Sequence, residues 1–242
     1  MSKTVLVTGA SRGIGKAIAI RLADQFDNII INSRKNMNEL EQTKSEIINC
    51  GKNCVSYLGD IGDYNFVKNM VRQCISEYKH IDCLINNAGI SYVGLLTDMT
   101  IEQWNEIVST NITSVFNCCN QIVPHMVKQK SGRIINISSM WGISGASCEV
   151  AYSAAKGAVN AFTQALAKEL APSNIQVNAL ACGAIDTEMN NHFSKEEMTD
   201  FCETIPTGRL GTTDEIAKMV SLLCDAPNYL TGEIIKIDGG YL

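Results

Sequence analysis

The chain has 242 residues, of which 45% are hydrophobic, and no low-complexity segment, so it can bury a full core as one large α/β domain. A net charge of −5 argues against nucleic acid or an anionic membrane surface as the main partner. No apolar run approaches the length of a membrane span and the first residues do not form a signal peptide, so we expect a cytoplasmic protein.

The first predicted element is a strand over residues 3–7, and a glycine-rich turn, Thr8 to Gly15, leads from it directly into a helix over residues 16–22. Backbone N–H groups at the start of a helix bind anions, and glycines let a pyrophosphate approach the backbone closely. Because the turn has a strand before it and a helix after it, we predict a cradle for a dinucleotide there. The alternative is a tight strand-to-helix turn that binds nothing.

The second predicted strand, residues 28–34, ends in Ser33 and Arg34 and has no acidic residue at its end. A carboxylate at this place would bind both ribose hydroxyls and repel a 2′-phosphate. Arg34, Lys35 and Arg12 of the glycine-rich turn can instead meet a phosphate that carries close to two negative charges. The sequence therefore favours NADPH over NADH, unless Arg34 and Lys35 are ordinary solvated residues after a strand.

A loop and then a long helix are predicted over residues 94–123, with the helix starting at Ile101 and closed by Pro124. Asn111 lies inside this helix, where asparagine is a mediocre helix former. The residues alone indicate a polar side chain on an exposed helix face. The apolar face of the same helix, which includes Phe116, is expected to be core or subunit interface.

The chemistry is expected between residues 134 and 168. Residues 134–139 form a β-branched run that ends in hydroxyls, which is typical of a buried parallel strand that stops at a polar edge. The helix that starts near Ala151 places Tyr152 and Lys156 one turn apart on one face. An ammonium beside a phenol favours the phenolate and lowers its pKa, so the pair can do acid–base work while Ser139 holds a carbonyl oxygen. A Tyr-x-x-x-Lys pair also occurs by chance on many helices.

After this helix, the sequence predicts a strand over residues 175–180, a turn over residues 181–189 and a last strand near residues 232–240. Residues 188–208, with their scattered charges and a proline, indicate a mobile lid that encloses substrate. We interpret His192 as a surface residue of this lid and not as a catalytic acid.

Five motifs in this order resemble the short-chain dehydrogenase/reductase family. They are TGxxxGxG at Thr8–Gly15, NNAG at Asn86–Gly89, Asn111, Ser139, and YxxxK at Tyr152–Lys156. The resemblance implies a single doubly wound Rossmann-type α/β domain over residues 1–242, with a parallel seven-stranded sheet and helices on both faces. The dinucleotide-binding half would span about residues 1–130 and the catalytic and substrate half about residues 131–242, in a homotetramer or homodimer.

The resemblance also implies an enzyme that transfers hydride between NADPH and a ketone. Ser139 would position the carbonyl and Tyr152 would donate a proton, while Lys156 would lower the pKa of Tyr152 and bind the nicotinamide ribose. Asn111 would interrupt its helix and hold a water that connects Lys156 to solvent. The implied cofactor-binding residues are Gly9, Ser11, Arg12, Gly13, Ile14, Gly15, Ser33, Arg34, Asp60, Ile61, Asn87, Ala88, Gly89, Tyr152, Lys156, Gly183, Ile185 and Thr187.

Cysteine is frequent, with ten residues and no CxxC pair among them. We expect the thiols to be reduced and mostly buried, and we predict no metal site. Cys182 stands where the family usually has proline, which should loosen the turn beside the nicotinamide.

The chain resembles most closely the bacterial 3-oxoacyl-acyl-carrier-protein reductases of fatty acid biosynthesis. Their acidic carrier protein docks on basic side chains near the active-site rim, where Lys128, Lys130 and Arg133 could serve, but a second basic position falls at Ser173. The loop 140–150 instead resembles that of reductases acting on a 5-aminopentanone modification of elongation factor P. Glu149 in this loop could recognise a cationic amine or be a solvated charge. A third alternative is a non-catalytic NADPH-binding sensor or scaffold, against which the intact set of catalytic residues speaks.

Overall fold

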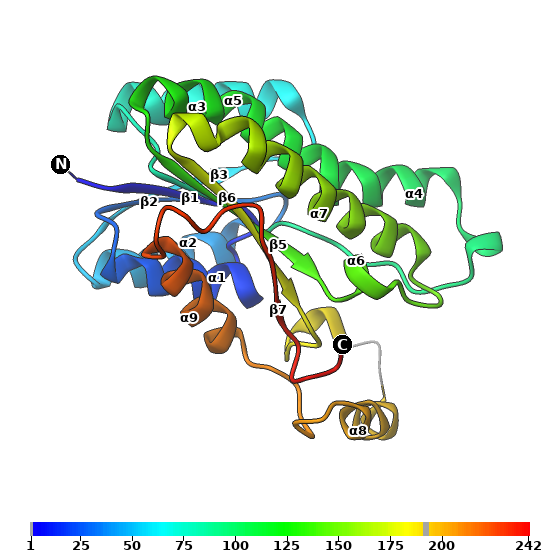
Figure 1. Ribbon diagram of the computed structural model, residues 1–242. Coiled ribbons are helices and arrows are strands. Elements are labelled where there is room, and N and C mark those ends of the chain that lie inside the picture. Colours follow the sequence, from blue (N-terminus) through cyan, green and yellow to red (C-terminus); the bar gives the residue numbers. More distant parts are fainter. Residues whose placement is uncertain (1, 191–193) are drawn as a thin grey trace.

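The computed structural model describes residues 2–190 and 194–242, and its strands form one sheet (Figure 1). The seven strands lie in the order β3-β2-β1-β4-β5-β6-β7, and every neighbouring pair is parallel. The bounds are β1 Thr4–Val7, β2 Asn28–Ser33, β3 Asn53–Leu58, β4 Cys83–Asn86, β5 Gly132–Ser139, β6 Ile175–Cys182 and β7 Ile234–Ile237. The predicted Rossmann-type fold with a seven-stranded parallel sheet is confirmed.

The central strands are continuous runs of β-branched and apolar residues. Every residue of β1, β2, β4 and β6 is buried, as expected of strands that are covered on both faces. Because β1 lies between β2 and β4, the strand order reverses at this point, and the carboxyl ends of β1 and β4 flank a crevice. The glycine-rich turn follows β1 and the NNAG turn overlaps the end of β4, so both lie at this crevice.

Helices cover both faces of the sheet (Figure 1). One layer contains α1 (Gly13–Arg21), α2 (Met37–Asn49) and α9 (Thr213–Cys224), which share one apolar cluster with the strands. The other layer contains α3 (Tyr64–Tyr78), α5 (Ser114–Gln129) and α7 (Val150–Leu170), which share a second cluster. Within the described residues, the remaining α-helices are α4 (Ile101–Val108), α6 (Trp141–Ser144) and α8 (Lys195–Thr204). In the part of the chain that is described, no helix is long and apolar enough to cross a membrane.

The long helix predicted from Ile101 is interrupted at Asn111. A π-helical turn, Ser109–Thr113, separates α4 from α5 and contains Asn111. The side chain of Asn111 is fully buried, so the expectation of an exposed polar residue is wrong. The helix interruption that the family resemblance implied is present.

The prediction that Pro124 closes this helix is also wrong, because α5 continues to Gln129 with Pro124 inside it. A proline inside a helix costs about 3 kcal/mol through the missing N–H and its ring. Ile122 and Met126, on either side of it, are fully buried, and each gains about 1.5–3 kcal/mol from that burial. The packing of this segment therefore outweighs the local cost of the proline.

The ten cysteines are free thiols, of which five are buried, four partly buried and one exposed. Burial raises the pKa of Cys74 to about 11 and the pKa values of Cys119 and Cys182 to about 12. Below pH 9 a thiol keeps its proton in both the folded and the unfolded state, so it adds no pH dependence. Above pH 9 the unfolded thiols lose their protons while the buried thiols keep theirs, and unfolding becomes more favourable.

We therefore expect the free energy of unfolding to fall between pH 9 and pH 11, by about 1.4 kcal/mol per pH unit for each fully buried thiol. Lys156 opposes this fall, because its pKa is lowered from 10.5 to about 8 and the unfolded amine then holds the extra proton in this range. Urea unfolding in the presence of a reductant measures the slope. Cys119→Ala should reduce the slope and Cys50→Ser, at an exposed thiol, should not; a stability that is constant up to pH 11 would contradict the prediction.

Candidate active site

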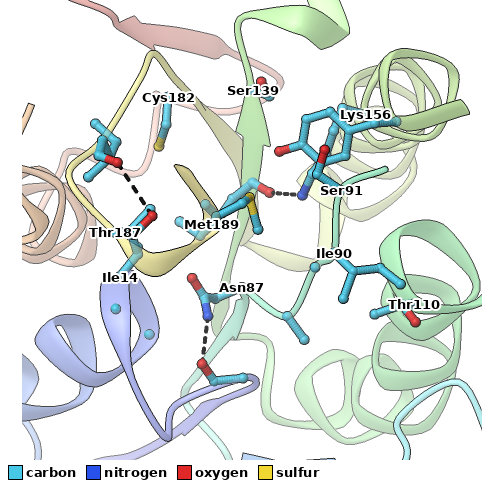
Figure 2. Close-up of a pocket in the computed structure, with 18 of the residues that line it drawn as sticks. Ile14, Asn87, Ile90, Ser91, Thr110, Ser139, Lys156, Cys182, Thr187 and Met189 are labelled. Carbon is cyan, nitrogen blue, oxygen red and sulfur yellow. Dashed lines mark hydrogen bonds between the residues drawn. The ribbon is translucent and has the colours of Figure 1, made fainter. Parts of the chain in front are cut away.

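A cavity of about 1580 Å³ opens at the carboxyl edge of the sheet and reaches from the glycine-rich turn to α7 (Figure 2). Every predicted cofactor-binding residue lines it, as do Ser139, Tyr152 and Lys156. Asn111 does not line the cavity; its neighbour Thr110 does. His192 lies outside the described residues.

The glycine-rich turn has the shape of a cradle that side chains would fill. Gly9 has a φ of +65°, and a Cβ on Gly15 would lie 2.2 Å from the Gly9 carbonyl oxygen and 2.4 Å from the Asn87 Nδ2. The Asn87 amide donates to the carbonyls of Thr8 and Gly9, at 2.9 and 3.0 Å, and so ties the NNAG turn to the cradle; Figure 2 draws one of these two bonds. The side chain of Arg12, the N-cap of α1, makes no hydrogen bond to the first turn. These residues fit a dinucleotide, because the close backbone and the open helix N-terminus suit a pyrophosphate.

Two cations expected to bind a 2′-phosphate border the same cavity, and both are ion-paired. Arg34 Nη2 lies 2.8 Å from Glu106 Oε1, and Arg34 Nη1 lies 3.9 Å from Asp60 Oδ2. Arg12 Nη1 lies 2.8 Å from Glu188 Oε2 and 4.0 Å from a Glu39 oxygen. The third cation, Lys35, also lines the cavity and is exposed. Nothing in the spacing of the sequence indicated these pairs, since Glu106 and Glu188 come from distant segments.

Ser139, Tyr152 and Lys156 come together where the end of β5 meets the first turns of α7. All three side chains are buried, with 6%, 9% and 4% of their surface exposed. Lys156 Nζ donates to the Ile137 carbonyl at 2.8 Å and lies 5.7 Å from the centre of the Tyr152 ring. The three residues therefore face one small volume, as the sequence predicted.

The pKa of Tyr152 is shifted in the direction opposite to the one that the sequence indicated. Burial raises the pKa of Tyr152 above its ordinary value, and the hydrogen bond with Ser139 lowers it by less. Burial also lowers the pKa of Lys156 to about 8. The expected lowering of the Tyr152 pKa by Lys156 is therefore not found: burial of the phenol sets the direction, and the amine, 5.7 Å from the ring centre, does not contribute to the shift. At neutral pH the phenol is neutral and can donate a proton.

Asn111 lies behind the cavity and holds the backbone that follows the NNAG turn. Its Nδ2 donates to the carbonyls of Ile90 and Ile107, both at 2.9 Å, and its Oδ1 accepts from Ile90 N at 3.2 Å. A Cβ on Gly89 would lie 2.7 Å from Asn111 Oδ1 and 3.4 Å from Lys156 Nζ. A larger residue at position 89 would collide with the Asn111 side chain, so glycine is needed there. Gly89 thus separates the Asn111 amide from the Lys156 amine by a narrow gap.

The substrate side of the cavity has one polar and one aromatic wall. Glu149 accepts a hydrogen bond of 2.6 Å from Ser91, and both residues line the cavity. Trp141 packs edge-on against Tyr241, with ring centres 5.6 Å apart, and Phe201 of α8 lies 6.2 Å from the same tyrosine. Ser91, Phe201 and Tyr241 were not predicted, since only the fold brings these distant residues to Trp141 and Glu149.

The basic residues considered for carrier-protein docking lie elsewhere. Lys128 is in the last turn of α5, Lys130 caps that helix, and Arg133 is the second residue of β5. Since β5 carries Ser139 at its other end, these side chains are about 20 Å away, at the opposite edge of the sheet. Arg133 donates to the Leu223 carbonyl at 2.9 Å and so holds the end of α9. These residues do not border the cavity of their own chain.

A glycine cradle at the reversal point of a parallel sheet, in one cavity with a buried serine, tyrosine and lysine, defines a dinucleotide-dependent oxidoreductase. The chain belongs to the short chain dehydrogenase family, whose family model matches residues 3–198. It is accordingly an oxidoreductase that acts on CH–OH or ketone groups with a nicotinamide cofactor.

Curated relatives match the chain over its full length. The uncharacterized oxidoreductase YmfI of Bacillus subtilis is 39% identical over 245 residues, which cover 100% of this chain and 99% of the relative. The 3-oxoacyl-acyl-carrier-protein reductase FabG of Staphylococcus epidermidis is 37% identical over 241 residues, which cover 99% of each chain. The reductase of the same name from Chlamydia trachomatis is 38% identical over 244 residues, covering 99% of this chain and 97% of the relative.

Proposed function

We propose that this chain is an NADPH-dependent carbonyl reductase that acts on 3-oxoacyl groups carried by acyl carrier protein, in fatty acid biosynthesis. The observation that carries this proposal is that Ser139, Tyr152 and Lys156 line the same cavity as the glycine-rich turn. Relatives with this activity in their names are 37% and 38% identical to the chain over nearly its whole length, which supports the choice of substrate.

Each residue of the set has a proposed role. Ser139 holds and polarises the carbonyl oxygen, and the neutral phenol of Tyr152 donates a proton to that oxygen. Lys156, which is mostly charged below pH 8, binds the nicotinamide ribose. Asn111 holds a water that connects Lys156 to solvent. When bound, the nicotinamide cofactor supplies the hydride that reduces the carbonyl carbon.

NADPH is the proposed cofactor because Ser33, Arg34 and Arg12 border the cavity where the adenosine ribose would lie. We also propose that residues 1–242 form one domain in a cytoplasmic homotetramer or homodimer. Ile101 on α4 and Phe116 on α5 are 64% and 47% exposed, which supports a subunit contact on this helical layer.

A second substrate is favoured by one observation. The Glu149 carboxylate lines the cavity, fixed by Ser91 at 2.6 Å, and lies close enough to Tyr152 to raise the pKa of the phenol. A carboxylate held in this way suits a ketone that carries a cationic amine, such as a protein-bound 5-aminopentanone on elongation factor P.

Glu149→Gln distinguishes the two substrates. If the natural substrate is an amino-ketone, we expect the variant to lose about 10- to 100-fold in kcat/KM for that ketone, because the substituted amide no longer attracts a cation. The kcat/KM for an acetoacetyl thioester should stay within about twofold and serves as the internal control. NADPH consumption with both ketones, in the wild type and the variant, is the measurement. Equal losses on both ketones would remove the argument for the amine, and no turnover of either ketone would contradict the proposed function.

A further inference from the structure

Glu106 is the direct partner of the cation at the end of β2. Its Oε1 lies 2.8 Å from Arg34 Nη2; Arg34 follows β2 and Glu106 lies on α4. Arg34 is the only partner of the Glu106 carboxylate within residues 2–190 and 194–242. Arg34 lines the cavity, whereas Glu106 stands behind it on α4, with 51% of its side chain exposed.

The adenosine end of the cavity carries more negative charge than the sequence indicated. Two guanidinium groups, Arg34 and Arg12, face four carboxylates within 4.0 Å, and the Lys35 amine is the third cation that lines the cavity. A 2′-phosphate that approaches Arg34 brings close to two further negative charges. Because Glu106 is in contact with the same guanidinium, it both occupies the cation and repels the phosphate. The two ribose hydroxyls of NADH carry no charge and do not experience this repulsion.

Glu106 differs in this respect from Asp60, the other carboxylate beside Arg34. Asp60 Oδ1 accepts a hydrogen bond of 2.7 Å from Gly62 N, so that Asp60 has a structural partner of its own. The distance from Asp60 Oδ2 to Arg34 is 3.9 Å, longer than the 2.8 Å of the Glu106 pair. The charge of Glu106 can therefore be removed without disturbing the turn after β3.

We infer that Glu106 is a specificity-determining residue that acts through Arg34 and weakens NADPH binding relative to NADH binding. This inference rests on the proposed use of NADPH, with Arg34 at the 2′-phosphate. It extends that proposal, since it assigns to α4 a control of how strongly the enzyme prefers one dinucleotide over the other.

Glu106→Gln tests the inference, because the amide oxygen can still accept from Arg34 while the negative charge is lost. Calorimetric titration of the cofactor-free protein should show NADPH binding about three- to tenfold tighter and NADH binding within about twofold of the wild type. Glu102→Gln is the matched control, since Glu102 is exposed one turn earlier on α4. It should change neither affinity by more than about twofold. Unfolding of each variant in urea verifies that the fold is retained.

A double-mutant cycle tests whether Glu106 acts through Arg34. In an Arg34→Gln background, Glu106→Gln should raise NADPH affinity by a smaller factor than it does with Arg34 present, because only the direct repulsion between the carboxylate and the phosphate is then relieved. The gain in the single variant should also shrink at 1 M salt. Unchanged or weaker NADPH binding by Glu106→Gln would overturn the inference, as would an equal gain in Glu102→Gln. A wild type that binds NADH more tightly than NADPH would instead refute the proposed cofactor. The inference about Glu106 would then stand or fall on whether Glu106→Gln raises the ratio of NADPH affinity to NADH affinity.

Discussion

Tyr152→Phe is expected to lower kcat for ketone reduction about 10²- to 10⁴-fold while the fold and the affinity for the cofactor are retained. The phenol is 9% exposed and its pKa is raised by burial, so at neutral pH it holds the proton that a developing alkoxide needs. Phenylalanine fills the same volume but has no proton to give. The measurement is the steady-state kcat, together with a direct titration of the cofactor.

Tyr78→Phe is the matched control for this variant. Tyr78 is a partly buried tyrosine on α3 whose pKa burial also raises, to about 12, but it does not line the cavity. Removal of the Tyr78 hydroxyl should leave kcat within about twofold of the wild type, as expected of a change away from the site. A Tyr152→Phe variant with near wild-type turnover would show that another group supplies the proton.

Gly15→Ala is expected to abolish cofactor binding at accessible concentrations and to destabilise the protein by about 1–3 kcal/mol. The added Cβ would lie 2.2 Å from the Gly9 carbonyl oxygen, which belongs to the backbone and cannot rotate away. The cradle must therefore widen, and the backbone N–H groups at the start of α1 move from the place where they meet a pyrophosphate. Calorimetric titration and urea unfolding measure the two effects.

Gly157→Ala adds the same methyl group to a helix in open surroundings. A Cβ on Gly157 would meet only the Gly142 carbonyl oxygen, at 3.5 Å, which is an ordinary contact. Alanine is the better helix former, so this variant should be stabilised by about 0.5–1 kcal/mol and should bind the cofactor like the wild type. Wild-type cofactor affinity in Gly15→Ala would refute the role assigned to the cradle.

The strands, the glycine-rich turn and the Tyr152 helix could be predicted from the sequence because each is fixed by its own residues. The β-branched run Ile29 to Ile31 favours a buried strand and lies in β2, and α7 begins within one residue of the predicted Ala151. Pro124 was misjudged because the burial of Ile122 and Met126 is a tertiary effect. Local preference indicated a helix end, and packing overrode it.

The chemistry of the site was predicted less well than its residues. All but Asn111 of the predicted site residues line one cavity, because the family pattern places them there. The pKa of Tyr152 depends on how much water the fold excludes, which no spacing of residues reveals. The carboxylates on Arg34 and Arg12 are likewise contacts between distant segments, and they reduce the free positive charge on which the preference for NADPH was argued.

The contact between Trp141 and Tyr241 gives the protein an optical signal of its own. The chain has two tryptophans, and Trp141 lines the cavity while Trp104 packs against a separate apolar cluster. Any molecule that enters between the aromatic wall and Ser139 changes the surroundings of the Trp141 indole directly, whereas Trp104 does not line the cavity. Occupancy of the cavity can therefore be followed by intrinsic emission, without a label and without turnover.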